Sequence, residues 1–173
     1  SVVWTGTEMI IWGGRDSSQF NLDTGSRYDP AADTWTFTTR LGAPEVRHAH
    51  SAAWGGARMV IWGGNLGNST QTGGLYDPET DSWVDTTTVN APAPRLFHSS
   101  VWTGTRMIVW GGNQGSHSVN LYNTGGRYDP VTDVWTPTST ADAPSGRFSH
   151  SAVWTGAEMI VWGGDHSQIA YTD

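Results

Sequence analysis

Arginine and histidine are the side chains in this sequence best suited to binding or acid–base chemistry, and they recur in a fixed pattern. An Arg-x-x-His-Ser element occurs three times, at Arg47 and His50, Arg95 and His98, and Arg147 and His150. A catalytic group is normally needed only once in a protein, so three copies at one register favour a structural role. We expect these side chains to hydrogen-bond loop carbonyls or an aspartate of the neighbouring repeat.

His48 and His50 form a His-x-His pair, which the other two elements lack. Residues i and i+2 of a strand share a face, so the two imidazoles could ligate one metal ion. A third ligand would have to come from another loop, where His117 and His166 are available. Because His50 belongs to the repeated element and only His48 is added, we expect no metal and no cofactor here.

Pairs of aspartates recur four residues apart and could be read as the two carboxylates of a glycoside hydrolase. They are Asp29 and Asp33, Asp77 and Asp81, and Asp129 and Asp133. In each pair the first aspartate precedes a proline, which suits the first two positions of a type I turn. The repetition and the Asp-Pro sequence therefore predict turn capping rather than catalysis.

The composition excludes several classes of function. The chain has 173 residues, a formal net charge of -7 and no cysteine, and all nine of its cationic side chains are arginine. The negative charge argues against a nucleic-acid partner and an anionic membrane surface. The lack of cysteine excludes disulfides, thiolate chemistry and cysteine-ligated zinc, and no stretch reaches the ~18 apolar residues of a membrane span. Abundant Thr, Ser, Gly and Trp without lysine lead us to expect an extracellular or periplasmic location.

A segment ending in Trp-Gly-Gly organises the chain, because it recurs four times at a period of roughly 50 residues. Each copy leads from Ser-x-x-Trp through a short joint containing glycine into an apolar run. The run, rich in β-branched and aromatic residues, predicts a strand buried on both faces, and the glycine joint predicts a tight hairpin. The repeated residues, which we expect to be structural, are Trp12, Gly13, Gly14, Trp62, Gly63, Gly64, Trp110, Gly111, Gly112, Trp162, Gly163 and Gly164.

Two further pieces complete each unit. A Tyr-Asp-Pro sequence and then a tryptophan follow three of the four Trp-Gly-Gly copies. No segment shows a helical periodicity of useful length, and four short antiparallel strands joined by regular turns predict an all-β fold. The repeated aromatic residues, again expected to be structural, are Tyr28, Tyr76, Tyr128, Trp35, Trp83 and Trp135.

An apolar run into a double glycine, then a tyrosine and then a tryptophan resembles the kelch repeat, and the resemblance covers the whole chain. It implies a β-propeller of four-stranded antiparallel blades, about three and a half in this chain, whose tryptophan-rich sheets bury one another's faces. The blades would span about 1–41, 47–88, 95–140 and 147–173. Members of this family are usually rigid binding scaffolds and sometimes enzymes. Copper oxidases of the galactose oxidase type use a tyrosine cross-linked to cysteine, which this chain lacks.

One segment of each unit varies in length. The spacing from Trp-Gly-Gly to the next tyrosine changes, whereas the other repeat spacings are constant. In an up-and-down blade this segment opens on the same face as the connection between blades, so the long loops share a face: 15–25, 38–49, 65–73, 86–97, 113–124 and 137–149. Function on a rigid scaffold tends to lie on such loops. The candidate binding residues are Arg15, Asp16, Gln19, Asn65, Asn68, Asn113, Gln114, His117, Asp165 and His166.

The repeat count predicts an open arc. Three units are complete and a fourth stops after its second strand, unless 169–171 forms a third. Propellers close with about four to eight blades, so an open arc would leave strand edges and tryptophan-rich faces bare. We therefore expect either self-association or a continuation of the chain to close the ring.

The sequence favours a non-catalytic scaffold that presents its polar loops to a protein or carbohydrate partner. Two alternatives stay open. The chain could be part of a kelch-type enzyme, such as an oxidase, lyase or sugar epimerase, with its site at the axial mouth of the loop-bearing face. It could also be a structural repeat of a large surface protein.

Overall fold

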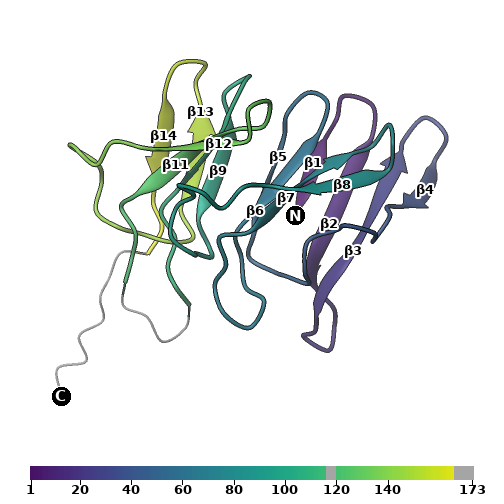
Figure 1. The fold of residues 1–173 in the computed structure, drawn as a ribbon, viewed down its shortest axis with the longest axis horizontal. Coiled ribbons are helices and arrows are strands. Elements are labelled where there is room, and N and C mark those ends of the chain that lie inside the picture. The colour runs from purple at the N-terminus through teal and green to yellow at the C-terminus, as the bar shows by residue number, and fades with distance from the viewer. Residues whose placement is uncertain (116–119, 166–173) are drawn as a thin grey trace.

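The computed structural model describes residues 1–115 and 120–165, and these form four β-sheets and no helix (Figure 1). The strands are β1 (Val2–Trp4), β2 (Met9–Arg15), β3 (Asn21–Asp29), β4 (Thr34–Phe37), β5 (Ser51–Trp54), β6 (Met59–Trp62), β7 (Gly73–Asp77), β8 (Ser82–Asp85), β9 (Ser99–Trp102), β10 (Met107–Trp110), β11 (Gly125–Asp129), β12 (Val134–Pro137), β13 (Ser151–Trp154) and β14 (Met159–Trp162). In this described part of the chain, nothing resembles a helix that could cross a membrane.

Each of the first three sheets is an antiparallel meander whose strands follow chain order, and the fourth contains β13 and β14. In the first sheet Trp4 is paired with Met9, Met9 with Tyr28, and Tyr28 with Trp35. The corresponding residues pair in the second and third sheets. Constant spacing along the sequence therefore corresponds to the same strand register in each complete sheet. The predicted all-β fold is confirmed.

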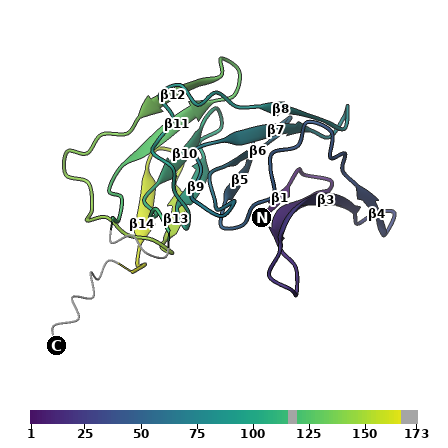
Figure 2. The same ribbon diagram turned by 60° about the horizontal axis from the view of Figure 1, so that its bottom comes forward.

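The sheets stand side by side as blades around a common axis. Their first strands are innermost, since β1 packs on β5, β5 on β9, and β9 on β13. Figure 2 shows the resulting arc, in which the sheets fan out from these inner strands and the ring is not closed. The predicted partial propeller is confirmed.

The core lies between neighbouring blades, and tryptophan dominates it. Trp12 of β2 packs on Trp83 of β8 with ring centroids 5.4 Å apart, and Trp62 of β6 packs on Trp135 of β12 at 5.2 Å. Burial of one such large side chain stabilises the fold by roughly 2–3 kcal/mol. Because each blade contributes only one side of each contact, no blade can bury its own tryptophans alone.

The expectation of burial is wrong for the last copy of the Trp-Gly-Gly segment. Trp12, Trp62 and Trp110 are at most 6% exposed and belong to the buried core, whereas Trp162 is 81% exposed. Likewise β6 is buried along its whole length, but β14 is buried on neither face. The physical reason is that cover comes from the following blade, and none of the described residues packs outside β14.

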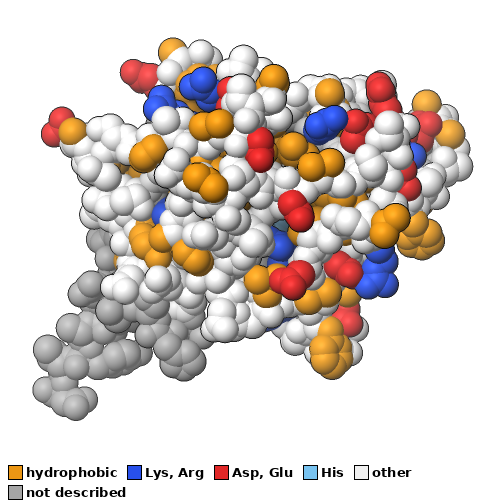
Figure 3. Space-filling view, viewed as in Figure 1, with side chains coloured by type: hydrophobic (Ala, Val, Ile, Leu, Met, Phe, Trp, Pro, Cys, Tyr) orange, Lys and Arg blue, Asp and Glu red, His pale blue; other side chains and the backbone are white. Residues whose placement is uncertain are grey.

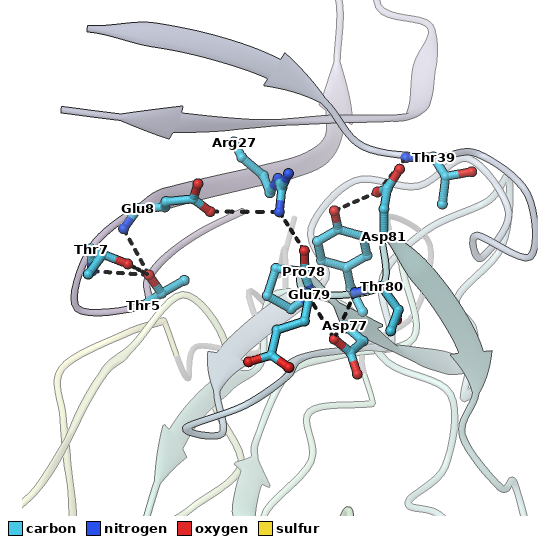
Figure 4. A network of polar contacts seen from close by, with 11 residues as sticks. Thr5, Thr7, Glu8, Arg27, Thr39, Asp77, Pro78, Glu79, Thr80 and Asp81 are labelled. Atoms are coloured by element: carbon cyan, nitrogen blue, oxygen red, sulfur yellow. Dashed lines mark hydrogen bonds and ion pairs between the residues drawn. The ribbon is translucent and has the colours of Figure 1, made fainter. Parts of the chain in front are cut away.

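The tight turns lie on one face of the arc and confirm the predicted capping. Asp77 Oδ1 accepts the backbone N–H groups of Glu79 and Thr80. Asp81, the second aspartate of the pair, accepts the hydroxyl of the repeated tyrosine and also the N–H of Thr39 from the preceding blade (Figure 4). The aspartates therefore cap their own turns and in addition join neighbouring blades.

The first variable segment is mostly strand, so the predicted loop 15–25 is too long. β2 continues to Arg15 and β3 begins at Asn21. Asp16 closes the turn between them, because its N–H donates to the carbonyl of Phe20 and its Oδ1 accepts the N–H of Phe20. This turn lets both strands extend, and the β2–β3 hairpin projects from the lower edge of Figure 1.

Candidate functional site

The connections that follow Trp-Gly-Gly share a face with the connections between blades, as the strand directions require. Isolated antiparallel bridges join them: His48 with Asn65, Leu96 with Asn113, and Phe148 with Asp165. Each bridge links the segment before a first strand to the variable loop of the same blade. We call this side, at the bottom of Figure 1, the loop face, and the side with the Thr-Gly and Asp-Pro turns the turn face.

The repeated arginines lie beneath the loop face and hold its connections in place. Arg95 is 1% exposed. Its Nη1 donates to the carbonyls of Gly111 and Thr124 at 2.9 and 2.7 Å, and its Nε donates to the carbonyl of Ala93 at 3.0 Å. The ring of Tyr122 covers the guanidinium at 4.3 Å. Burial lowers the pKa of Arg95 to about 10, so the group remains charged at neutral pH.

The other two repeated arginines make hydrogen bonds of the same kind but differ in how deeply they are buried. Arg47 is equally buried, and its Nη1 donates to the carbonyls of Gly63 and Thr72. Arg147 donates to the carbonyl of Gly163 at 3.0 Å but is more exposed. All three guanidinium groups thus donate to loop carbonyls. Arg47 and Arg95 precede complete four-stranded sheets and are buried, whereas Arg147 precedes the two-stranded sheet and is more exposed.

Each repeated histidine meets a serine of the preceding blade rather than an aspartate. Nε2 of His98 lies 2.8 Å from Oγ of Ser51, and Nε2 of His150 lies 2.7 Å from Oγ of Ser99. The His98 ring also packs edge-on against Trp62 at 5.2 Å. A nucleophilic serine needs a histidine whose second nitrogen is oriented by another group, but Nδ1 of these buried histidines has no hydrogen-bond partner among the described residues. The pairs therefore act as links between blades.

Acid is expected to destabilise the protein through these histidines. Burial, followed by the nearby charges of Arg95 and His150, lowers the pKa of His98 from 6.5 to about 3. Between these values the unfolded chain binds a proton that the folded chain excludes. Stability therefore falls as the pH drops below 6.5 and levels off near 3, by about 1.4 kcal/mol per pH unit for each such histidine.

Urea unfolding at about pH 7 and about pH 5 measures this loss. His98→Gln keeps a polar group near Ser51 but has no proton to take up, so its stability should depend less on pH than that of the wild type. Equal pH slopes for the two proteins would contradict the assignment of the loss to His98.

Two of the predicted binding residues shape their own loops. Asn65 Oδ1 accepts the N–H of Gly67 at 2.6 Å, and Asn113 Oδ1 accepts the N–H of Gly115 at 3.0 Å. Asn113 is also buried, which limits its access to a ligand. Gln114 follows it and is exposed.

Other predicted positions are placed only in part. Asp165 pairs through its backbone with Phe148. His117, His166 and the possible strand 169–171 lie outside the described residues.

Arg15 and His48 meet on the loop face through Asn21, which the sequence did not single out. Asn21 Oδ1 accepts a hydrogen bond from Nε of Arg15 at 3.2 Å and lies 2.9 Å from Nδ1 of His48, while its Nδ2 donates to the carbonyl of Asn65. Burial and then the charge of Arg15 lower the pKa of His48. His48 and His50 therefore contact different partners, and within the described ranges no three His, Asp or Glu side chains are grouped to hold a metal ion.

Exposed phenylalanines on the loop face are a second feature that sequence reasoning missed. Phe97 and Phe148 lie with ring centroids 6.2 Å apart, just before two innermost strands. Phe97 is 42% exposed, and Phe20 is 70% exposed on the turn of the projecting β2–β3 hairpin. Figure 3 shows hydrophobic side chains at the lower edge of the molecule, where this hairpin projects. A comparison of the repeats would have given the signal, because Phe97 stands where the others have Ala49 and Ser149.

A hollow of about 480 Å³ opens beside Arg47 and is lined by the carboxylates of Glu45 and Asp85. Burial lowers the pKa of Arg47 to about 10, and the two carboxylates oppose this effect. In the next blade Ala93 and Pro137 stand at the corresponding positions. The acidic rim therefore belongs to a single blade, where it could accept a cationic side chain of a partner.

Comparison with known families adds an independent observation. The model of a family described as the KLHDC2/KLHL20/DRC7 Kelch-repeats domain matches residues 1–173. No curated protein matches the chain. The family match extends over every blade of the arc, and it confirms the resemblance read from the repeated motifs.

Proposed function

We propose, from the premise that this chain belongs to the kelch-repeat family, that it is a protein-interaction scaffold that binds its partner on the loop face. The strand register is constant from blade to blade while the loops differ in length. Such a division suits a rigid support that carries variable binding segments. The partner is a protein segment with apolar side chains rather than a glycan.

Phe97 is the main reason for placing the binding site on the loop face. Its φ of 57° lies in the left-handed region, where a residue other than glycine costs of order 1–3 kcal/mol and often marks a functional position. The fold needs only a small side chain there, since Ala49 and Ser149 adopt the same conformation in the other repeats. Aromatic residues are enriched at the centres of protein interfaces, so a partner explains this phenylalanine better than folding does.

The side chains of the loop face favour a protein over a sugar. Phe148 adds a second ring beside Phe97, and Phe20 and Arg15 stand on the projecting hairpin. Exposed aromatic rings with arginine at the side are the composition expected of a protein interface. Two loop amide oxygens that could bond sugar hydroxyl groups, those of Asn65 and Asn113, instead accept backbone N–H groups within their own loops.

Phe97→Asn is expected to separate binding from stability. Asparagine tolerates the left-handed backbone better than phenylalanine, so the melting temperature should stay the same or rise. Peptides selected on the wild-type chain from a random library displayed on phage are the probe. Their affinity for the variant should fall at least about tenfold, because an aromatic anchor is lost.

Arg58→Ala on the turn face is the control. Arg58 forms an exposed ion pair with Asp77 at 3.4 Å, and the loss of such a pair changes stability little. Peptide affinity should not change. The proposal fails if the selected peptides lose affinity for the Arg58 variant instead, or if a glycan array yields a ligand while peptide selection yields none.

A further inference from the structure

The acidic hollow beside Arg47 opens on the loop face. One wall is the connection from β4 to β5, which supplies Pro44 and Glu45, and the other is the end of β8 with the residue after it, Asp85 and Thr86. Both walls belong to the loop face, because β8 runs from the turn face to the loop face. A hollow of about 480 Å³ lies within the size range of ligand pockets, so it can hold a long side chain of a partner.

The two carboxylates of the hollow are not paired within the protein. Glu45 and Asp85 are exposed, and neither side chain forms an ion pair or a hydrogen bond with another described residue. Other carboxylates are occupied, as Asp77 and Asp81 are in capping their turn. The hollow therefore presents two free negative charges side by side in the lining of one recess.

The presence of Arg47 in the lining does not explain this acidic pair. Arg95, the same repeated arginine in the next blade, makes equivalent hydrogen bonds to carbonyls although alanine and proline stand at the two acidic positions. The pKa of each arginine is lowered to about 10, so the carboxylates do not make Arg47 a more stable cation than Arg95. The fold holds its buried arginine without them, and they are available to a ligand.

A buried hydroxyl adds a further polar group to the lining. Thr86 is 6% exposed, and its Oγ1 has no hydrogen-bond partner among the described residues. Buried polar groups are normally paired, so this oxygen offers an acceptor to a bound group. The hydroxyl recurs as Thr138 in the next blade, where the carboxylates are missing. Thr86 thus makes the recess polar, and the acidic pair determines the sign of the charge that it selects.

We propose that the acidic hollow binds an arginine side chain of the partner protein, an inference that rests on the proposed binding of a protein on the loop face. A guanidinium group presents its N–H donors in a planar fork, which suits two carboxylates and a hydroxyl oxygen better than the compact ammonium group of lysine does. The net charge of -7 also attracts a basic partner over a longer range. The hollow selects for charge, while Phe97 supplies the apolar contact.

N-acetylarginine amide tests the hollow by itself, and N-acetylcitrulline amide, which has nearly the same shape without the charge, is the matched control. In NMR titrations of the full chain, the backbone amide signals around Glu45 and Asp85 should shift saturably with the arginine compound and not with the citrulline compound. The double variant Glu45→Gln/Asp85→Asn should lose these shifts. Glu79→Gln, which removes an exposed carboxylate from the turn face, should keep them.

Three results would overturn the proposal: no saturable shift, equal shifts with citrulline, or shifts that persist in the double variant. Both substituted side chains are exposed, so the melting temperature of the double variant should match that of the wild type. Glu45→Ala, which copies Ala93 of the next blade, takes its place if the double variant unfolds.

The peptides selected on the wild type separate this inference from the proposed function. We expect them to contain an arginine and to bind the double variant at least about tenfold more weakly than the wild type. If Phe97→Asn weakens them and the double variant does not, the inference about the hollow is wrong and the proposed function stands. If only the double variant weakens them, the hollow is supported and the role of Phe97 in the proposed function is wrong.

Discussion

Replacing Arg95 by methionine is expected to lower the free energy of unfolding by about 4 kcal/mol. Methionine fills much of the same volume but cannot donate to the carbonyls of Ala93 and Gly111. Each buried acceptor left unpaired costs about 1–3 kcal/mol, and loss of the cation over the Tyr122 ring adds about 1–2 kcal/mol. Urea unfolding followed by tryptophan fluorescence measures the difference.

Arg147→Met is the matched control, because it removes the same side chain from the same repeated element. Arg147 donates to the carbonyl of Gly163, but it is more exposed than Arg95, so water can replace its hydrogen bonds. We expect a loss within about 1 kcal/mol. Similar losses for the two variants would show that burial does not set the contribution of these arginines.

Gly63→Ala is expected to destabilise the protein by about 3–4 kcal/mol. Gly63 has a φ of 73°, and a β-carbon on it would lie 2.7 Å from Cε1 of His98 and 3.1 Å from the carbonyl oxygen of Arg95. His98 cannot move aside without disturbing its contact with Ser51. The substitution therefore adds a steric overlap between two blades to the conformational cost of a left-handed alanine.

Gly163→Ala isolates that conformational cost. Gly163 has a similar φ of 70°, but no atom of the described residues lies within 4 Å of the place of its β-carbon. We expect a loss of about 1 kcal/mol, measured by the same urea unfolding. If Gly63→Ala cost no more than this, the close approach of His98 would not constrain the junction.

Much of the scaffold could be predicted from the sequence because the repeats preserve strand register. The distances that join Trp4, Met9, Tyr28 and Trp35 along the chain recur in each complete unit, and pairing across antiparallel strands requires constant distances. The face that carries the loops followed from strand direction alone. The turn-capping role of the aspartates could also be predicted, because Asp-Pro suits the first two positions of a type I turn.

Partners that depend on the neighbouring blade could not be predicted from one repeat. The contact of His98 with Ser51 joins residues far apart in sequence, and an aspartate was an equally reasonable partner. The exposure of Trp162 depends on what packs against it, which its own repeat does not encode. Phe97 differs in size from Ala49 and Ser149 already in the sequence, but its left-handed backbone conformation appears only in three dimensions.

The bonds between blades have a consequence for how such a molecule can evolve. Thr39 donates to Asp81 across the first junction, and Thr87 donates to Asp133 across the second. A tandem duplication that inserts one whole unit would bring a donor for the next blade and an acceptor for the previous one. The number of blades can thus change by recombination without a compensating mutation at either new boundary. What each added blade changes is the curvature of the arc.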